Sequence, residues 1–295
     1  MAVMPEWGRR IGSKLAGHSL PLLLAVLFLL PAWWVVVLSL RQPGLPPSLS
    51  IPWWPTDPAF GNYHQLFDLV PMARQAVNSF LVVGIAVPLT IVTASWAGYA
   101  MANLGARRRR RFVVGAVLLM LVPVTALWLT RFILFKNLGL MNTLGALIVP
   151  AIGGTNPFYV LLFYWTFRRI PRETFEAARL DGAGHWRVWF RLAMPLARPT
   201  IVTVGVLTFS FYWSDLISPL LYLRSPGLYT LPIGLSSLQQ MDVTDAPLIM
   251  AGVVVILTPV IGAFLLAHRY FWPDEMLLKP LDLKAPTGVE VGDPS

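Results

Sequence analysis

RETFEAARLDGAGHWRVWFRLAMPLARP, residues 172–199, is a polar, arginine-rich segment between two long apolar runs. Hydrophobic residues make up 56% of the 295-residue chain and charged residues only 13%. An average soluble domain has roughly 25% charged residues, so most of this chain has no need to face water. We therefore expect a membrane protein in which this segment lies outside the bilayer.

Six apolar stretches are each long enough to cross a hydrocarbon core about 30 Å thick, which takes about 20 residues. The sequence therefore predicts an all-α membrane protein with six transmembrane helices. We expect a membrane domain over residues 20–270, an N-terminal tail of residues 1–19 and a C-terminal tail of residues 271–295. The predicted spans are 20–40, a stretch within 75–102, 112–130, a stretch within 137–167, about 200–223, and 246–267.

The fourth span contains the sequence Gly153-Gly154-Thr155-Asn156-Pro157. This break indicates either a broken helix that lines a cavity or simply the end of a loop. The sequence leaves both readings open.

Lysine and arginine in the connections indicate the orientation, because cytoplasmic connections retain them. Of the 23 such residues, 18 fall on the side of the two termini and five on the other side. Both termini, the run Arg107–Arg111 and residues 172–199 are therefore predicted to be cytoplasmic. The net charge of +9 follows from this asymmetry, so we expect anionic lipid, and no nucleic acid, as its partner.

Several chemistries lack their usual residues in this sequence. The chain has no cysteine, and no pair of its four histidines has metal-ligand spacing. No G-x-x-x-x-G-K-[ST] loop is present for ATP, and no nucleophile, base and orienting group converge. We therefore expect no catalytic residue, no metal site and no cofactor in this chain, and no enzyme activity of its own.

Within residues 172–199, the sequence predicts two short helices joined by a glycine bend. Pro171 stands where a helix can begin, and two glycines follow Asp181. The second helix carries an apolar stripe at helical spacing and is expected to end at Pro195. One interpretation of this amphipathic pair is a helix that rests on lipid; the other is a docking surface that transmits force. The stripe consists of Trp186, Trp189, Phe190 and Ala193.

The spacing within this segment resembles a known motif. Glu176-Ala177-Ala178, three residues, Gly182, nine residues and then Leu192-Ala193-Met194-Pro195 is similar to the EAA loop of ATP-binding-cassette (ABC) importer permeases. Leu192 and Met194 replace Ile and Leu of that pattern. Further segments resemble the carbohydrate branch related to the maltose permease subunit MalG, over roughly residues 70–270. These segments are 138–143, 179–183, 208–220 and 228–235.

The resemblance implies a division of labour between subunits. The EAA loop, between helices 4 and 5, would form a coupling helix in a cleft of an ATPase subunit, where Glu176 meets a basic residue. Expected partners are a second, MalF-like permease subunit, two ABC ATPase subunits that bind ATP and Mg, and an extracytoplasmic solute-binding protein, in a bacterial or archaeal cytoplasmic membrane. The implied ATPase-coupling residues are Glu176, Ala177, Ala178, Asp181, Gly182 and Pro195.

The implied solute is a sugar, an oligosaccharide or a disaccharide, and its path is marked by few polar residues. Asp215 is the only acid inside a predicted span, and charges there are usually functional. Tyr212, Trp213 and Asn78 complete the candidate pathway. The alternative for Asp215 is that it caps a kinked helix beside Pro219.

The few charged residues in the spans bear on two other possible functions. A permease for glycerol-3-phosphate, or for a related polyol or phosphorylated solute, would need cationic side chains in the pathway to bind a phosphate. Only Arg74 and Arg131 lie near the outer parts of spans. An ion-driven secondary transporter or channel would place several ionisable groups at mid-membrane, whereas Asp215 stands alone. Both therefore rank below a sugar permease.

Overall fold

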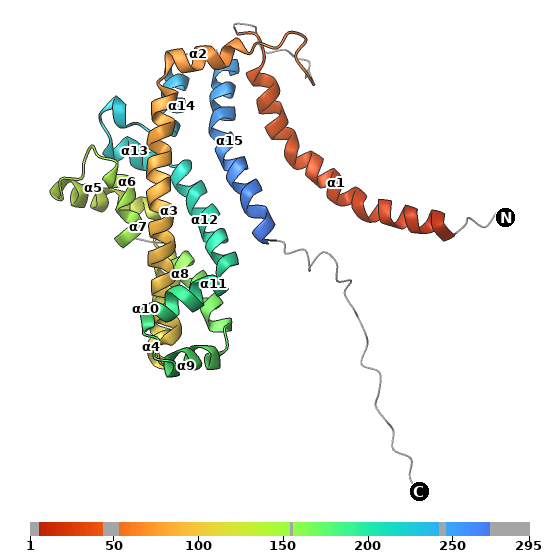
Figure 1. Ribbon diagram of the computed structural model, residues 1–295. Coiled ribbons are helices and arrows are strands. Elements are labelled where there is room, and N and C mark those ends of the chain that lie inside the picture. Colours follow the sequence, from red (N-terminus) through yellow and green to blue (C-terminus); the bar gives the residue numbers. More distant parts are fainter. Residues whose placement is uncertain (1–5, 44–52, 154–155, 242–245, 272–295) are drawn as a thin grey trace. The chain divides into compact units, whose positions relative to one another are not determined.

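The computed structural model describes residues 6–43, 53–153, 156–241 and 246–271, and over these residues the secondary structure is helical, with no strand (Figure 1). A helix satisfies its backbone hydrogen bonds within one segment, which is what a chain in hydrocarbon needs. The all-α prediction is confirmed for these residues. Of the predicted tails, residues 1–5 and 272–295 lie outside them, and residues 6–19 begin the first helix.

Within the part of the chain that the structure describes, three helices are long and apolar enough to cross a membrane, and up to six spans result if each of three interrupted helix pairs counts as one. The three long helices are α1 (Glu6–Ser39), of which Pro21–Ser39 is the apolar part, α3 (Met72–Asn103) and α15 (Ala246–Phe271). The interrupted pairs are Ala106–Met120 with Val124–Asn137, Gly145–Gly153 with Pro157–Arg169, and His185–Leu196 with Arg198–Trp213.

The third and fifth predicted spans are not continuous helices. Helix α4 (Ala106–Met120) ends before Pro123, which has no N–H to continue the helical bonding; η1 (Val124–Leu127) and α5 (Trp128–Asn137) follow. Helix α12 (Arg198–Trp213) ends before Asp215, and α13 (Ile217–Tyr222) follows. Pro219 cannot donate to the Asp215 carbonyl, so the helix breaks there.

The chain packs as two compact units. Unit 1 comprises residues 1–89, 123–154 and 209–261, and unit 2 comprises residues 90–122, 155–208 and 262–295. The elements of unit 1 that have not yet been given are α2 (Gly61–Leu69), α6 (Gly145–Ile148), α7 (Pro150–Gly153), η3 (Pro226–Leu228) and α14 (Leu231–Met241). Residues 154 and 155 of the predicted break lie outside the described residues.

Unit 1 is held together by buried polar groups as well as apolar side chains. The Asn78 side chain on α3 donates to the carbonyls of Gly227 (3.0 Å) and Tyr229 (2.9 Å). Its neighbour Ser79 accepts a hydrogen bond from the Leu231 N–H at 3.0 Å. These contacts fix the segment before α14 against α3, because breaking them would leave buried polar groups unpaired.

Asn142 makes a second clamp in unit 1. It has a left-handed backbone, φ 59°, and its side-chain oxygen accepts from the N–H groups of Arg224 (3.0 Å) and Ser225 (2.9 Å). Its own N–H donates to the Tyr222 carbonyl at 2.8 Å. Asn tolerates this conformation better than most residues, and its side chain fixes the loop of residues 138–144 to the segment after α13.

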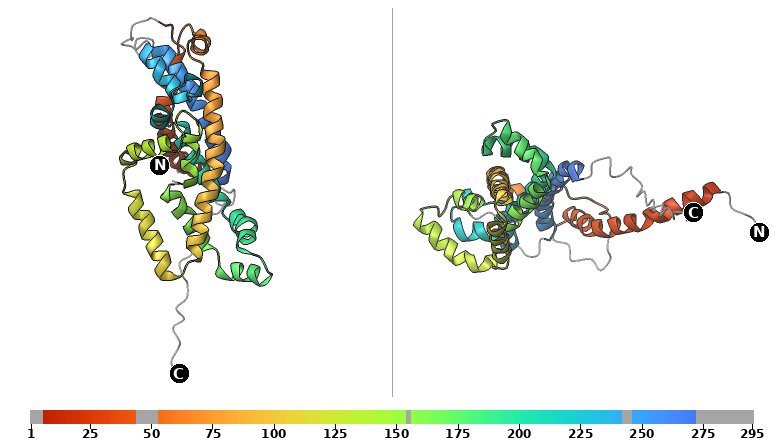
Figure 2. Two further views of the ribbon diagram at one scale, coloured as in Figure 1. Left: turned by 90° about the vertical axis from the view of Figure 1, so that its left-hand side faces the viewer. Right: turned by 90° about the horizontal axis from the view of Figure 1, so that it is seen from below.

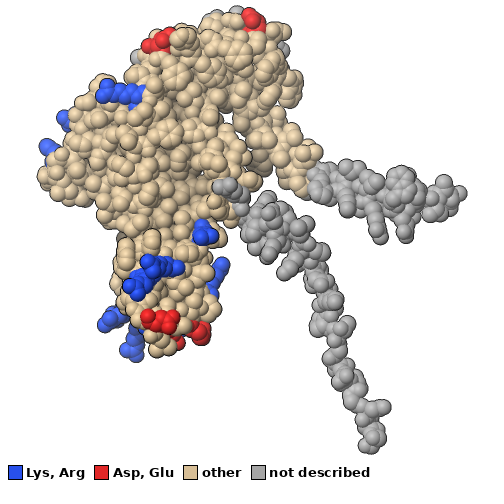
Figure 3. All heavy atoms as spheres, viewed as in Figure 1, with Lys and Arg blue, Asp and Glu red and all other residues tan. Residues whose placement is uncertain are grey.

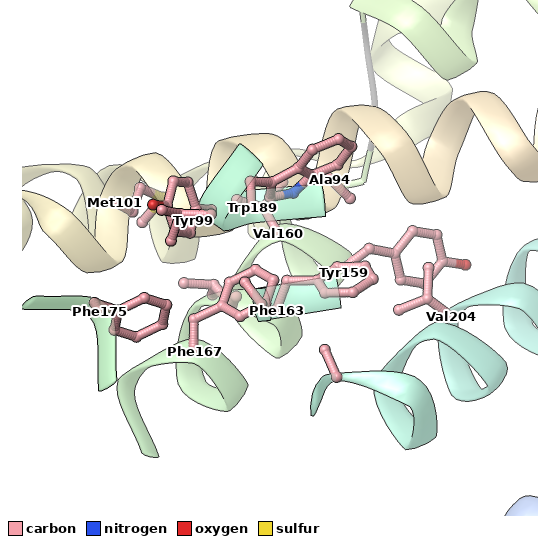
Figure 4. Close-up of a cluster of buried hydrophobic side chains, with 14 residues drawn as sticks. Ala94, Tyr99, Met101, Tyr159, Val160, Phe163, Phe167, Phe175, Trp189 and Val204 are labelled. Carbon is pink, nitrogen blue, oxygen red and sulfur yellow. The ribbon is translucent and has the colours of Figure 1, made fainter. Parts of the chain in front are cut away.

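Unit 2 is built around α8 (Pro157–Arg169), whose rings form the centre of a buried cluster (Figure 4). A Cβ at Gly98 of α3 would lie 2.8 Å from the Phe163 Cβ and 2.8 Å from the Tyr164 nitrogen. Glycine therefore permits the close approach of α3 and α8. The helices of the segment 172–196 pack on the same cluster.

Candidate functional site

Residues 172–196 form an elbow of short helices, as predicted (Figures 1 and 2). Helix α9 follows Pro171 and carries Glu173 in its first turn, where the helix dipole favours an anion. After a four-residue turn, the second arm is nearly continuous. The elbow comprises α9 (Arg172–Leu180), α10 (His185–Val188), the π-helical segment η2 (Trp189–Ala193) and α11 (Met194–Leu196).

The turn of the elbow explains the spacing of the EAA pattern. The N–H of Ala183 donates to the carbonyl of Ala178 and the N–H of Gly182 to that of Arg179, both at 3.0 Å, which is the Schellman arrangement. Gly182 has φ +75°, a backbone conformation that residues other than glycine rarely adopt. Ala178 and Ala183 both pack against the buried cluster. The second alanine and the glycine of the pattern therefore stand at the two positions that such a turn requires.

The inner face of the elbow is anchored by aromatic rings. Phe175 and Trp189 are 9% and 2% exposed, and Trp189 packs edge-on against Trp96 with ring centroids 5.0 Å apart. Phe175 contacts Tyr99 at 6.1 Å (Figure 4). Motion of the elbow would therefore be passed to α3 and α8 through packed rings.

The predicted stripe on the second arm is only half right. Trp189 and Ala193 are buried, whereas Trp186 and Phe190 are 61% and 60% exposed and Val188 is buried in their place. The buried face is therefore centred on Val188, Trp189 and Ala193, which lie on one side of a helix at spacings of one, four and five residues.

The second arm also runs further than predicted. Pro195 lies inside its last turn and does not end it, because a proline in the first turn of α11 needs no N–H donor. The arm ends at Leu196, and α12 leaves it at 83°. Leu192 and Met194, which depart from the pattern, both pack against the cluster, so these substitutions preserve the apolar anchor.

The outer face of the elbow is exposed and mixed in character. Glu176 and Ala177 are exposed, and among the residues that the structure describes Glu176 forms no salt bridge. Leu180, the last residue of α9, is 89% exposed. An unpaired carboxylate beside exposed apolar groups, on a helix whose other face is anchored, is suited to contact with another surface.

A cavity of about 440 Å³ adjoins this face. It lies among the turn between α3 and α4, the end of α8, and α9. Arg179 donates to the Asn103 side-chain oxygen at 2.9 Å across it, a pairing that the sequence did not reveal because the two residues lie far apart in the chain. Arginine side chains, drawn blue, gather over this end of unit 2 (Figure 3). The lining consists of Ala102, Asn103, Leu104, Gly105, Ala106, Arg109, Phe167, Arg168, Ile170, Arg172, Phe175, Glu176 and Arg179.

The four candidate pathway residues lie in unit 1. Trp213 is fully buried and donates its indole N–H to the Ile256 carbonyl at 2.9 Å, and Asn78 is committed to the clamp described above. Asp215 is half-buried and accepts from the Ser218 N–H at 3.1 Å, which caps α13, and Tyr212 is half-buried. The described residues contain no group of three His, Cys, Asp or Glu that could hold a metal.

Comparison with known proteins supplies the family. The model for "Binding-protein-dependent transport system inner membrane component" matches residues 86–270. The chain is 31% identical to the sulfoquinovosyl glycerol transport system permease protein SmoH of Agrobacterium fabrum, covering 79% of this chain and 81% of that protein. It is 28% identical to the diacetylchitobiose uptake system permease protein NgcG of Streptomyces coelicolor, covering 85% of this chain and 84% of that protein.

A solved structure agrees on the fold. A chain of a bacterial ABC transporter involved in the import of the acidic polysaccharide alginate superposes with a TM-score of 0.71 at 19% identity, covering 92% of this chain and all of that one. The family model covers more than half of the sequence, and the relatives match along most of it. The chain therefore belongs to the binding-protein-dependent transport system inner membrane components, and the predicted membership of the ABC importer permeases is confirmed.

Proposed function

We propose that this multi-pass membrane protein is a permease subunit that translocates a sugar, an oligosaccharide or a disaccharide, through an ATP-driven importer. The relatives reported above are named for sugar-containing solutes, sulfoquinovosyl glycerol and diacetylchitobiose. In this proposal the chain works with a second permease subunit, two ATPase subunits and an extracytoplasmic solute-binding protein. The membrane domain covers residues 20–270 in six spans, with both tails and the elbow on the cytoplasmic side.

The observation that carries the proposal is the two-faced elbow. Its inner face is buried through Phe175 and Trp189, and its outer face presents Glu176 and the exposed Leu180. A partner docked on the outer face would move the elbow as one piece, since the Schellman turn joins the two arms rigidly. The displacement would reach α8 through the start of α9, and it would reach α12 through Ala197.

The coupling follows from differential binding. The two clefts of an ATPase dimer that has closed on ATP are spaced differently from those of the open dimer. Elbows bound in these clefts therefore favour the permease conformation that matches the spacing of the closed dimer. Glu176 contributes a charge-assisted contact to a basic residue of the cleft. In this proposal the ATPase subunits bind ATP and Mg, and this chain responds only through the position of its elbow.

For the sugar pathway, we propose Tyr212 and Asp215 as the residues to test first. Both are half-buried, whereas Asn78 and Trp213 are buried and their side-chain donors hold the elements of unit 1 together. A tyrosine ring and a carboxylate together can stack on a sugar ring and bond its hydroxyls.

The test is a charge reversal on the outer face, Glu176→Lys, in the complex purified with its ATPase and permease partners. We expect sugar-stimulated ATP hydrolysis, measured with the loaded binding protein, to fall by about tenfold or more, as for loss of a buried charge-assisted contact at an interface. Glu173→Lys is the matched control, because Glu173 is exposed on the same helix but does not line the cavity. Unchanged stimulated hydrolysis in Glu176→Lys would contradict the proposal.

A further inference from the structure

The cavity beside α9 has an uncompensated positive charge. Four arginines line it, Arg109, Arg168, Arg172 and Arg179, against one carboxylate, Glu176. Over the part of the chain that the structure describes, none of these arginines forms a salt bridge. Cations gathered at a concave surface focus a positive potential, and their mutual repulsion is relieved when an anion binds.

Most of the hydrogen-bond donors of these arginines remain available. Arg179 uses one on Asn103, and Arg109 makes one long bond, 3.5 Å, to the Leu104 carbonyl. Arg168 and Arg172 donate no side-chain hydrogen bond to another described residue. A guanidinium has five N–H donors in a planar fork, which matches the oxygens of a phosphate.

The neighbouring surface of α4 and α8 indicates what kind of molecule carries that phosphate. In α4 the arginine run stops at Arg111, and the next residue, Phe112, is 58% exposed. Leu118 and Leu119 on the same helix are 57% and 62% exposed, and Trp165 near the end of α8 is 47% exposed. In a membrane protein such apolar surface faces hydrocarbon, and arginines one turn beyond it lie at the level of the lipid headgroups.

We propose that this cavity binds the headgroup phosphate of an anionic phospholipid. A volume of about 440 Å³ is within the range of small-ligand sites, which is roughly 300–1,000 Å³. Basic pockets between transmembrane helices on the cytoplasmic side are typical sites for anionic headgroups. The proposal goes beyond coupling to an ATPase, because it assigns the cavity a ligand that comes from the bilayer.

Such a site would bear on the elbow directly. Arg172 and Arg179 belong to α9, whereas Arg109 and Arg168 belong to α4 and α8. A phosphate held by all four would join α9 to the ends of the membrane helices, and it would lie beside Glu176, which shares the cavity. The lipid would thus stabilise the position of α9 from which Glu176 is presented.

The experiment counts bound lipid in the complete complex by native mass spectrometry. The complex, with its ATPase subunits, is reconstituted in nanodiscs of phosphatidylglycerol and phosphatidylcholine in equal parts and then transferred to detergent. We expect one phosphatidylglycerol retained per copy of this chain. In Arg168→Gln/Arg172→Gln the retained fraction should fall roughly tenfold, since each arginine near a membrane surface contributes to anionic-lipid binding. The control, Arg187→Gln/Arg191→Gln, removes the same charge from the elbow outside the cavity and should retain the lipid.

Four results would overturn the proposal. One is equal retention in the two double variants, and another is retention of phosphatidylcholine as readily as phosphatidylglycerol. The third is displacement of the lipid by millimolar inorganic phosphate, which would assign the arginines to free phosphate. The fourth is retention only when the ATPase subunits are absent, which would assign the arginines to an acidic surface of the ATPase. Because lipid retention is measured without ATP turnover, its failure is separate from failure of the coupling proposal.

Discussion

Ala178 and Gly182 set the geometry of the elbow at the scale of single residues. The alanine offers the carbonyl that closes the six-residue loop of the turn, and the glycine supplies the left-handed backbone. Alanine also fits where a larger side chain would separate α9 from the cluster. The interval of four residues between them is therefore a consequence of helix termination, independent of any partner.

Gly182 should not tolerate even the smallest side chain. Nothing lies within 4 Å of a Cβ added there, so Gly182→Ala tests the backbone alone. We expect a cost of about 1 kcal/mol from the left-handed conformation, seen as faster hydrogen exchange of the amides of residues 182 and 183. Gly184→Ala is the matched control: that glycine also has open space but an ordinary φ of −66°. Equal exchange in both variants would refute the Schellman turn.

The roles of single residues were only partly predictable from the sequence. The sequence pattern indicated the bend at Gly182 because few residues other than glycine suit such a turn. It could not show that Trp213 is fully buried, since an aromatic residue near a carboxylate is equally typical of a sugar site and of a core. The capping interpretation of Asp215, left open from the sequence, agrees with its bond to the Ser218 N–H.

At the scale of elements, the contact of α3 with α8 controls the platform under the elbow. Gly98 lies where the two helices meet, and a Cβ there would approach backbone atoms of α8, the Tyr164 nitrogen at 2.8 Å and the Val160 oxygen at 2.9 Å. Because backbone atoms cannot rotate away, the helices themselves would have to separate.

Gly98→Ala should therefore destabilise the protein by about 1–3 kcal/mol, as overpacking of a tight interior does. The measurement is the thermal unfolding temperature of the detergent-solubilised complex. Gly84→Ala serves as control in the same helix, with nothing within 4 Å, and should be neutral or stabilising by up to ~1 kcal/mol because alanine is the better helix former. Indistinguishable unfolding temperatures would mean that α3 and α8 do not pack at Gly98.

Element boundaries were the least predictable feature. Hydropathy identified the long helices α3 and α15 because their apolar runs are uninterrupted. It joined residues 112–130 into one span, because an apolar run has the same hydropathy whether or not Pro123 interrupts its hydrogen bonds. The rotation of the buried face in the second arm was also hidden, since the exposed Trp186 and Phe190 are as apolar as the residues that are buried.

At the scale of the whole molecule, the fold class and the family were both predictable. Composition predicted a helical membrane protein, and the resemblance predicted the family that the comparisons confirm. The cavity beside α9 could not be foreseen, because its arginines come from three segments that only the fold brings together and because the run at 107–111 has a sufficient reading as a topology anchor. Sequence spacing therefore predicted the elbow, whereas the cavity beside it depends on three-dimensional packing.

We propose that the outer face of the elbow docks on an ATPase subunit at the cytoplasmic surface. Since the chain contains no cysteine, Leu180→Cys provides a single thiol in it, on a side chain that is 89% exposed in α9. The control is Leu129→Cys, on a side chain that is 71% exposed in α5 and predicted to lie near the other membrane surface.

The measurement is cross-linking from that thiol, with a short thiol-reactive photo-cross-linker, in membranes that contain the complete transporter. We predict a covalent product between this chain and the ATPase subunit from Leu180→Cys, lost when the ATPase subunit is omitted, and none from Leu129→Cys. Labelling of Leu180→Cys by a membrane-impermeant maleimide from the extracytoplasmic side, with no ATPase product, would contradict the account.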